Sequence, residues 1–158
     1  MAIDRQGTGL AILRICIGVF FLFEGLGKIR WLTDPSQLAG QLAGWAQAAP
    51  AGSWSHAYLE RVAMPYAALF ARLVPLGELT SGAALVAGFW TPLFALVAFF
   101  MAFNFQFASG ALFKYSALTS GYALPVLGAT LALAVGGRRL PWSIGGAAPR
   151  RAMKVKGS

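Results

Sequence analysis

Four long stretches of this chain are apolar enough to cross a membrane as helices. They cover residues 8–27, 65–88, 92–109 and 120–137. A bilayer core about 30 Å thick needs about 20 mostly apolar residues per helix, and each stretch comes close to that length. Only 11% of the 158 residues are charged, against about a quarter in an ordinary soluble domain. The sequence therefore predicts an all-α fold, a four-transmembrane-helix antiparallel bundle over residues 1–140.

The first two stretches carry opposite charges in mirrored order. Arg14 precedes Glu24 in the first, and Arg72 precedes Glu78 in the second. If these helices run antiparallel, Arg14 lies at about the same membrane depth as Glu78, and Glu24 lies at about the same depth as Arg72. Ionisable groups in membrane spans usually face partners, cavities or functional sites. We expect an inner pair, Arg14 with Glu78, whose main role is to fix the register of the two helices. We also expect an outer pair, Glu24 with Arg72, for which a structural role and ligand binding are about equally favoured. Both pairs need a kink at Pro75 that turns the charges of the second helix inward.

More polar groups gather near the outer ends of these helices. Lys28 follows Glu24 by four residues and competes with Arg72 for the same carboxylate. We expect Glu24 and Glu78 to handle protons, and we expect five residues to bind a ligand: Lys28, Arg72, Arg14, Asn104 and Gln106. A row of phenylalanines within 92–109 fits a slot for a quinone ring, although such rows more often face lipid or pack between helices.

The longest segment between spans, residues 29–64, is expected to lie outside the cytoplasm. Leu38, Leu42 and Trp45 recur within it at helical spacing, which predicts a short amphipathic helix at the outer membrane interface. Basic residues gather instead after the fourth stretch: Arg138, Arg139, Arg150, Arg151, Lys154 and Lys156. By the positive-inside rule the C-terminus lies in the cytoplasm, and four spans place the N-terminus there too. We expect residues 141–158 to form a basic cytoplasmic tail that contacts lipid headgroups rather than nucleic acid.

Few residues that could hold a redox cofactor or a metal are present. The chain has one cysteine, Cys16, and one histidine, His56. A single cysteine excludes an internal disulfide and dithiol chemistry, and a single histidine excludes haem held by two histidines. No metal-ligand set of the usual spacing and no Gly-rich phosphate loop occurs. A redox role would therefore use a diffusible carrier such as quinone, or cofactors on a partner subunit.

Two blocks of sequence match the pattern of a known family. Arg14, Gly18, Gly25 and Lys28 resemble the first-helix pattern of the DoxX/DoxD-like membrane family. The stretch PLGELTSGAALVAGFWTPLFAL is similar to the family's second helix and its short turn into the third. The resemblance covers roughly residues 10–105 and implies a four-helix integral membrane protein. One branch of that family is the membrane subunit of thiosulfate:quinone oxidoreductase, and other members are redox-associated.

Three functions are compatible with these expectations. The first is the membrane subunit of a quinone-linked redox system, of the sulfur-oxidising or oxidative-stress type, in a bacterial or archaeal inner membrane. The second is a non-catalytic accessory subunit that binds protein partners in a larger membrane complex. The third is a small proton-coupled transporter that uses Glu24 or Glu78. An arginine beside each glutamate would keep the acid ionised, which counts against the third.

Overall fold

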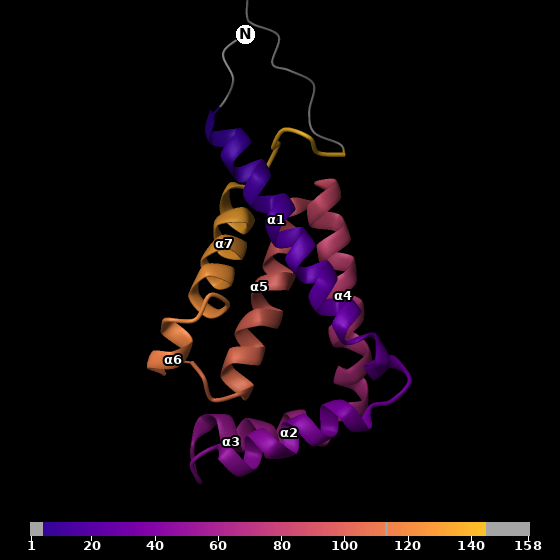
Figure 1. Ribbon diagram of the computed structural model, residues 1–158, viewed down its shortest axis with the longest axis vertical. Helices are drawn as coiled ribbons and strands as arrows, with labels where there is room; N and C mark the ends of the chain where they lie inside the picture. The colour runs from indigo at the N-terminus through magenta and orange to yellow at the C-terminus, as the bar shows by residue number, and fades with distance from the viewer. Residues whose placement is uncertain (1–4, 113, 145–158) are drawn as a thin grey trace, which may run out of the picture.

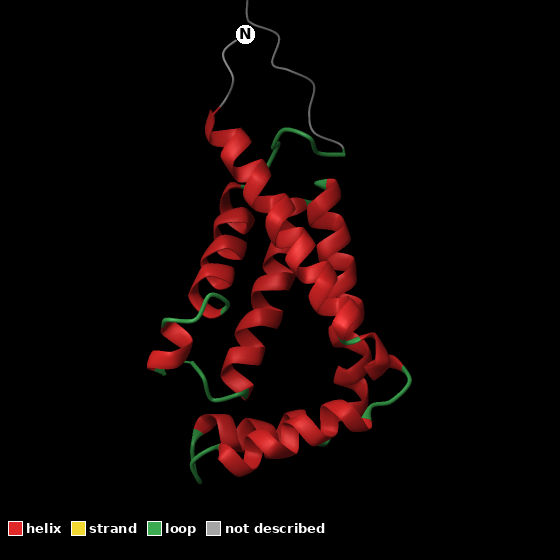
Figure 2. Ribbon diagram, in the orientation of Figure 1, coloured by secondary structure: helices red, strands yellow, loops and turns green. Residues whose placement is uncertain are grey.

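The computed structural model describes residues 5–112 and 114–144, and every regular element in these ranges is a helix (Figure 1). Four apolar helices run along the molecule: α1 (Arg5–Gly27), α4 (Ala67–Ala87), α5 (Thr91–Ala108) and α7 (Ala123–Gly136). Shorter helices lie toward the end remote from the N-terminus: α2 (Ser36–Ala48), α3 (Trp54–Tyr58) and α6 (Tyr115–Leu118). A 3-10 turn at Ile29–Leu32 connects α1 to α2, and a π-helical turn at Leu59–Ala63 connects α3 to α4. Figure 2 shows that these connections leave only short loops.

Three of these helices, α1, α4 and α5, are long and apolar enough to cross a bilayer. Their bounds agree with the predicted stretches to within a few residues. By contrast, α7 has 14 residues. It therefore rises about 21 Å, less than a hydrocarbon core of about 30 Å. The stretch predicted at 120–137 becomes helical only from Ala123, whose N–H donates to the Ser120 hydroxyl at 3.2 Å, as is common where a helix begins.

The helices α1 and α4 run antiparallel with their backbones in close approach at glycines. A Cβ added to Gly18 would lie 2.7 Å from the Val86 nitrogen, and one added to Gly82 would lie 2.6 Å from the Leu22 nitrogen. Small residues at facing positions let helices approach closely in membranes. The first two spans thus form the predicted antiparallel hairpin, and glycines set its register.

An apolar core joins α7 to the hairpin through α5. Ala95 and Ala98 of α5 and Leu133 of α7 are fully buried in this core. Thr130 is buried as well, and its hydroxyl donates to the Val126 carbonyl at 2.8 Å, so that its polar group is satisfied within its own helix. Because the α5 positions facing α7 are small, the two helices pack closely.

The helices α2 and α3 lie across the ends of α4 and α5, at the end remote from the N-terminus (Figure 1). The helix predicted from LAGQLAGWAQ is present, and it buries Leu38 and Leu42 against Leu59 and Ala108. Its apolar face therefore packs on the protein. Trp54 at the start of α3 is 85% exposed.

Candidate functional site

Neither of the two predicted ion pairs forms. Arg14 is fully buried, but its guanidinium lies beside Gly88, ten residues after Glu78 in the sequence and so about 15 Å away along a helix. Arg72 is exposed, and it makes no ion pair within the described residues. The reason is the glycine contacts between α1 and α4. These contacts place α4 roughly two to three helical turns along α1 from the register in which the predicted ion pairs would form.

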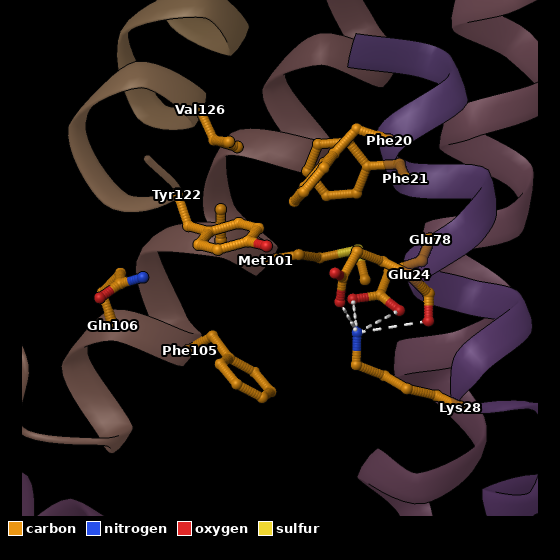
Figure 3. Close-up of a pocket in the computed structure, with 11 residues that line it drawn as sticks. Phe20, Phe21, Glu24, Lys28, Glu78, Met101, Phe105, Gln106, Tyr122 and Val126 are labelled. Atoms are coloured by element: carbon orange, nitrogen blue, oxygen red, sulfur yellow. Dashed lines mark hydrogen bonds and ion pairs between the residues drawn. The ribbon is translucent and has the colours of Figure 1, made fainter. Parts of the chain in front are cut away.

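Lys28 takes the place of both arginines beside the carboxylates (Figure 3). Its Nζ lies 2.6 Å from Glu24 Oε2, 2.8 Å from Glu78 Oε1 and 3.0 Å from Glu78 Oε2. Lys28 directly follows α1 and shares a face with Glu24 because four residues return a helical side chain to the same side. Glu78 reaches them from α4. We call these three residues the acid–lysine cluster.

Two carboxylates share one ammonium in the acid–lysine cluster. The side chains of Glu78 and Lys28 are only 8% and 13% exposed, whereas that of Glu24 is 41% exposed. The Lys28 ammonium also lies 5.7 Å from the centre of the Phe105 ring, a distance suited to a cation–π contact. With both acids ionised, the cluster has a net charge of −1. One added proton or one bound cation would neutralise it.

A pocket of about 330 Å³ opens beside the cluster, between α1, α5 and α7 (Figure 3). This volume lies within the range of small-molecule sites, about 300–1,000 Å³. Figure 3 shows Gln106 and Tyr122 on the side of the pocket away from the carboxylates. The rest of the wall is apolar: Phe20, Phe21, Met101, Ala102, Phe105 and Val126. The pocket therefore has an aromatic interior with charged groups at one end.

Asn104 faces a second space on another side of Glu78. Its Oδ1 accepts a hydrogen bond from the Tyr58 hydroxyl at 2.6 Å. Burial raises the pKa of the Tyr58 hydroxyl, and the hydrogen bond to Asn104 partly offsets this effect. Asn104 and Glu78 line a second pocket of about 350 Å³, and Met101 and Phe105 line both pockets. Glu78 thus lines pockets on two of its sides.

The structure brings together part of the predicted set of site residues. Glu24, Glu78, Lys28 and Gln106 line the first pocket. Three others lie elsewhere: Arg14, Arg72 and Asn104. Of the phenylalanine row on α5, Phe105 alone lines this pocket. Met101 and Tyr122 were missed, because an apolar thioether and a tyrosine near a helix start have no signal in the sequence that distinguishes them from packing residues.

A family model described as DoxX matches residues 9–111, well over half of the chain. The chain belongs to the DoxX family. This result confirms the resemblance seen in the first two spans. Comparison with curated proteins and with solved structures found no match.

The region matched to DoxX runs from Gly9 in α1 past the end of α5, and it contains the whole acid–lysine cluster and Gln106. Tyr122 and Val126, which complete the pocket, follow the matched region. Within the described residues of this DoxX protein, no group of three or more His, Cys, Asp or Glu side chains could hold a metal ion. The groups that this site offers are therefore carboxylates, an ammonium, an amide and aromatic rings.

Proposed function

We propose that this DoxX protein is the membrane subunit of a quinone-linked redox system, and that the pocket beside the acid–lysine cluster binds the quinone head group. The observation that carries this proposal is the pocket itself, with its aromatic wall and its charged, hydrogen-bonding end. A quinone head group fits such a site in chemistry, because its ring is apolar and its carbonyl oxygens accept hydrogen bonds.

Each side of the pocket has a distinct role in this proposal. Lys28 and Gln106, which lie on different sides of the pocket, donate hydrogen bonds to carbonyl oxygens (Figure 3). Phe105 and its neighbours pack against the ring. A bound quinone supplies two-electron, two-proton redox chemistry. Glu24 and Glu78 share one ammonium, and they hold and deliver protons at this end of the pocket.

The proposal includes a placement in the membrane. We place α1, α4, α5 and α7 as an antiparallel four-helix bundle in a bacterial or archaeal inner membrane, with both termini in the cytoplasm. Exposed Arg138 and Arg139 at one end support this orientation, and exposed Trp54 at the other end fits a membrane interface there. Helices α2 and α3 then lie at the outer interface, and the acid–lysine cluster lies in the outer half of the bilayer. We expect the electron donor to reside on a partner subunit.

Replacing Gln106 with leucine is expected to weaken binding of a short-chain quinone analogue about fivefold. The substitution removes one hydrogen-bonding group, which typically contributes about 1 kcal/mol, and keeps the size of the side chain. The dissociation constant is measured by titrating detergent-purified protein. Gln47→Leu is the matched control, because Gln47 is exposed on α2, and it should bind as the wild type does. Wild-type protein with no saturable binding would remove the quinone proposal and favour the accessory-subunit function.

Proton-coupled transport is a second candidate, and the charge balance of the cluster favours it. Glu24 and Glu78 share the single Lys28 ammonium, so the objection that each acid has its own cation applies to only one of the two charges. A bound cation would then replace a proton on the cluster. Binding of tetraphenylphosphonium should release a proton from the wild type and none from Glu78→Gln, as measured with a pH-sensitive dye in weak buffer. Proton release of equal size from both proteins would count against transport.

A further inference from the structure

A third pocket, lined in part by arginines, lies at the opposite end of the molecule from the acid–lysine cluster. It is formed where the turn between α4 and α5 meets the segment that follows α7, and its volume is about 300 Å³. Arg138 and Arg139 line one side, and Trp90, Thr91 and Ser143 line the other parts. Both arginines are exposed, and neither makes an ion pair within the described residues.

A third positive charge lies directly behind this pocket. The Arg14 guanidinium donates to the Trp142 carbonyl at 2.8 Å and to the Ser143 hydroxyl, and it lies against Gly88. Ser143 and Gly88 both line the pocket. Arg14 is fully buried, and its Nε has no hydrogen-bond partner in the described structure.

The positive charge at this end is not balanced by carboxylates in the described residues. Four acidic residues are described, and all lie in the other half of the molecule, in the acid–lysine cluster or near α2 and α3: Glu24, Asp34, Glu60 and Glu78. Buried charges in proteins are usually paired, and an unpaired one is costly. A bound anion would lower the cost of burying Arg14, because it would lie within the field of three guanidinium groups.

The surroundings of the pocket indicate a membrane surface. Trp90 and Trp142 are 65% and 63% exposed, and Trp90 stacks on Phe89 with ring centres 5.5 Å apart. Tryptophans are enriched where a membrane meets water, at the level of the lipid headgroups. A phosphate at that level would therefore lie at the height of Arg138 and Arg139.

We propose that this pocket binds the phosphate of an anionic membrane lipid. Arg138 and Arg139 contact the phosphate oxygens, as arginine does in many phosphate sites, and the Ser143 hydroxyl is a further donor at the pocket wall. Arg14 adds positive potential from behind the wall. The exposed tryptophans border the glycerol and upper acyl region. This site is independent of the proposed quinone pocket.

The test is a binding titration of the detergent-purified full chain, monitored by tryptophan fluorescence, because Trp90 lines the pocket and Trp142 directly precedes Ser143 of its wall. Short-chain phosphatidylglycerol is compared with short-chain phosphatidylcholine and with inorganic phosphate. The double variant Arg138→Gln/Arg139→Gln is compared with Arg30→Gln/Arg61→Gln, which removes two exposed arginines at the opposite end with the same change in net charge. Arg138→Gln alone is included as a variant that leaves the left-handed backbone of Arg139 (φ 59°) unaltered.

The wild type should bind phosphatidylglycerol more tightly than phosphatidylcholine. The Arg138→Gln/Arg139→Gln variant should lose about thirtyfold in affinity for phosphatidylglycerol, since each basic residue near an anionic membrane surface contributes about fivefold. Arg138→Gln alone should lose about fivefold, and Arg30→Gln/Arg61→Gln should match the wild type. Equal losses in the two double variants would overturn the proposal, because they would reflect net charge alone. Inorganic phosphate binding as tightly as phosphatidylglycerol would also overturn it, because the ligand would then be free phosphate.

Discussion

Lys28→Met is expected to destabilise the protein by about 3–5 kcal/mol, the usual cost of removing one partner from a buried ion pair. Lys28 is the shared counter-ion of Glu24 and Glu78, and Glu78 is only 8% exposed. Methionine fills a similar volume, so the loss reports on charge rather than packing. The free energy of unfolding is measured in detergent by thermal or chemical unfolding. The deficit should be smaller in acidic than in alkaline buffer, because protonated carboxyl groups need no counter-ion.

Two further variants separate this charge effect from a general effect of losing a lysine. Lys114→Met makes the same substitution at an exposed position and should change stability by no more than about 0.5 kcal/mol. Adding Glu78→Gln to Lys28→Met should restore most of the lost stability, because replacing both partners of a buried pair is often nearly neutral. A double variant that is no more stable than Lys28→Met would show that the cluster does not act through its charges.

Gly82→Ala is expected to separate α1 from α4 and to cost about 3 kcal/mol, at the upper end of the range for overpacking. The new Cβ would lie 2.6 Å from the backbone nitrogen of Leu22 and 2.8 Å from the carbonyl oxygen of Gly18. Backbone atoms cannot rotate away as a flexible side chain can, so the two helices must move apart. The midpoint of thermal unfolding, measured in one detergent by circular dichroism, checks this prediction.

The matched control for this prediction is Gly128→Ala in α7, where an added Cβ would meet no atom within 4 Å. Alanine is favoured over glycine within a helix by about 1 kcal/mol, so the control should be as stable as the wild type or slightly more stable. If Gly82→Ala and Gly128→Ala unfold at the same temperature, close backbone approach at Gly82 is not what holds the hairpin together.

The helices could be predicted from the sequence better than the way in which they pair. Long apolar stretches must become helices in a membrane, because no water is present to hydrogen-bond a free backbone, so the bounds of α1, α4 and α5 were predicted to within a few residues. The register was wrong because we assigned it from charges. Close approach at Gly18 and Gly82 determines it instead, and the charged side chains bind whichever groups that register brings near them.

The candidate site could be predicted where its geometry is local. Glu24 and Lys28 lie one turn apart, so their contact follows from helical periodicity alone. The contact of Glu78 with Lys28 depends on the hairpin register and was assigned to the wrong cation. The carbonyl partners of Arg14 come from residues more than 120 positions away, in a segment without regular structure. No sequence pattern specifies such a contact.

The hydrogen bonds between Arg14 and the segment after α7 have a consequence for biosynthesis. Arg14 leaves the ribosome 127 residues ahead of Pro141, whose carbonyl it contacts in the finished protein. At a synthesis rate of about 5–20 residues per second, the delay is on the order of ten seconds. During that interval α1 carries a guanidinium that has not yet met its final acceptors, and a long arginine side chain can then reach toward the lipid–water boundary. Residues translated long after α1 thus complete the burial of a charge in the first helix.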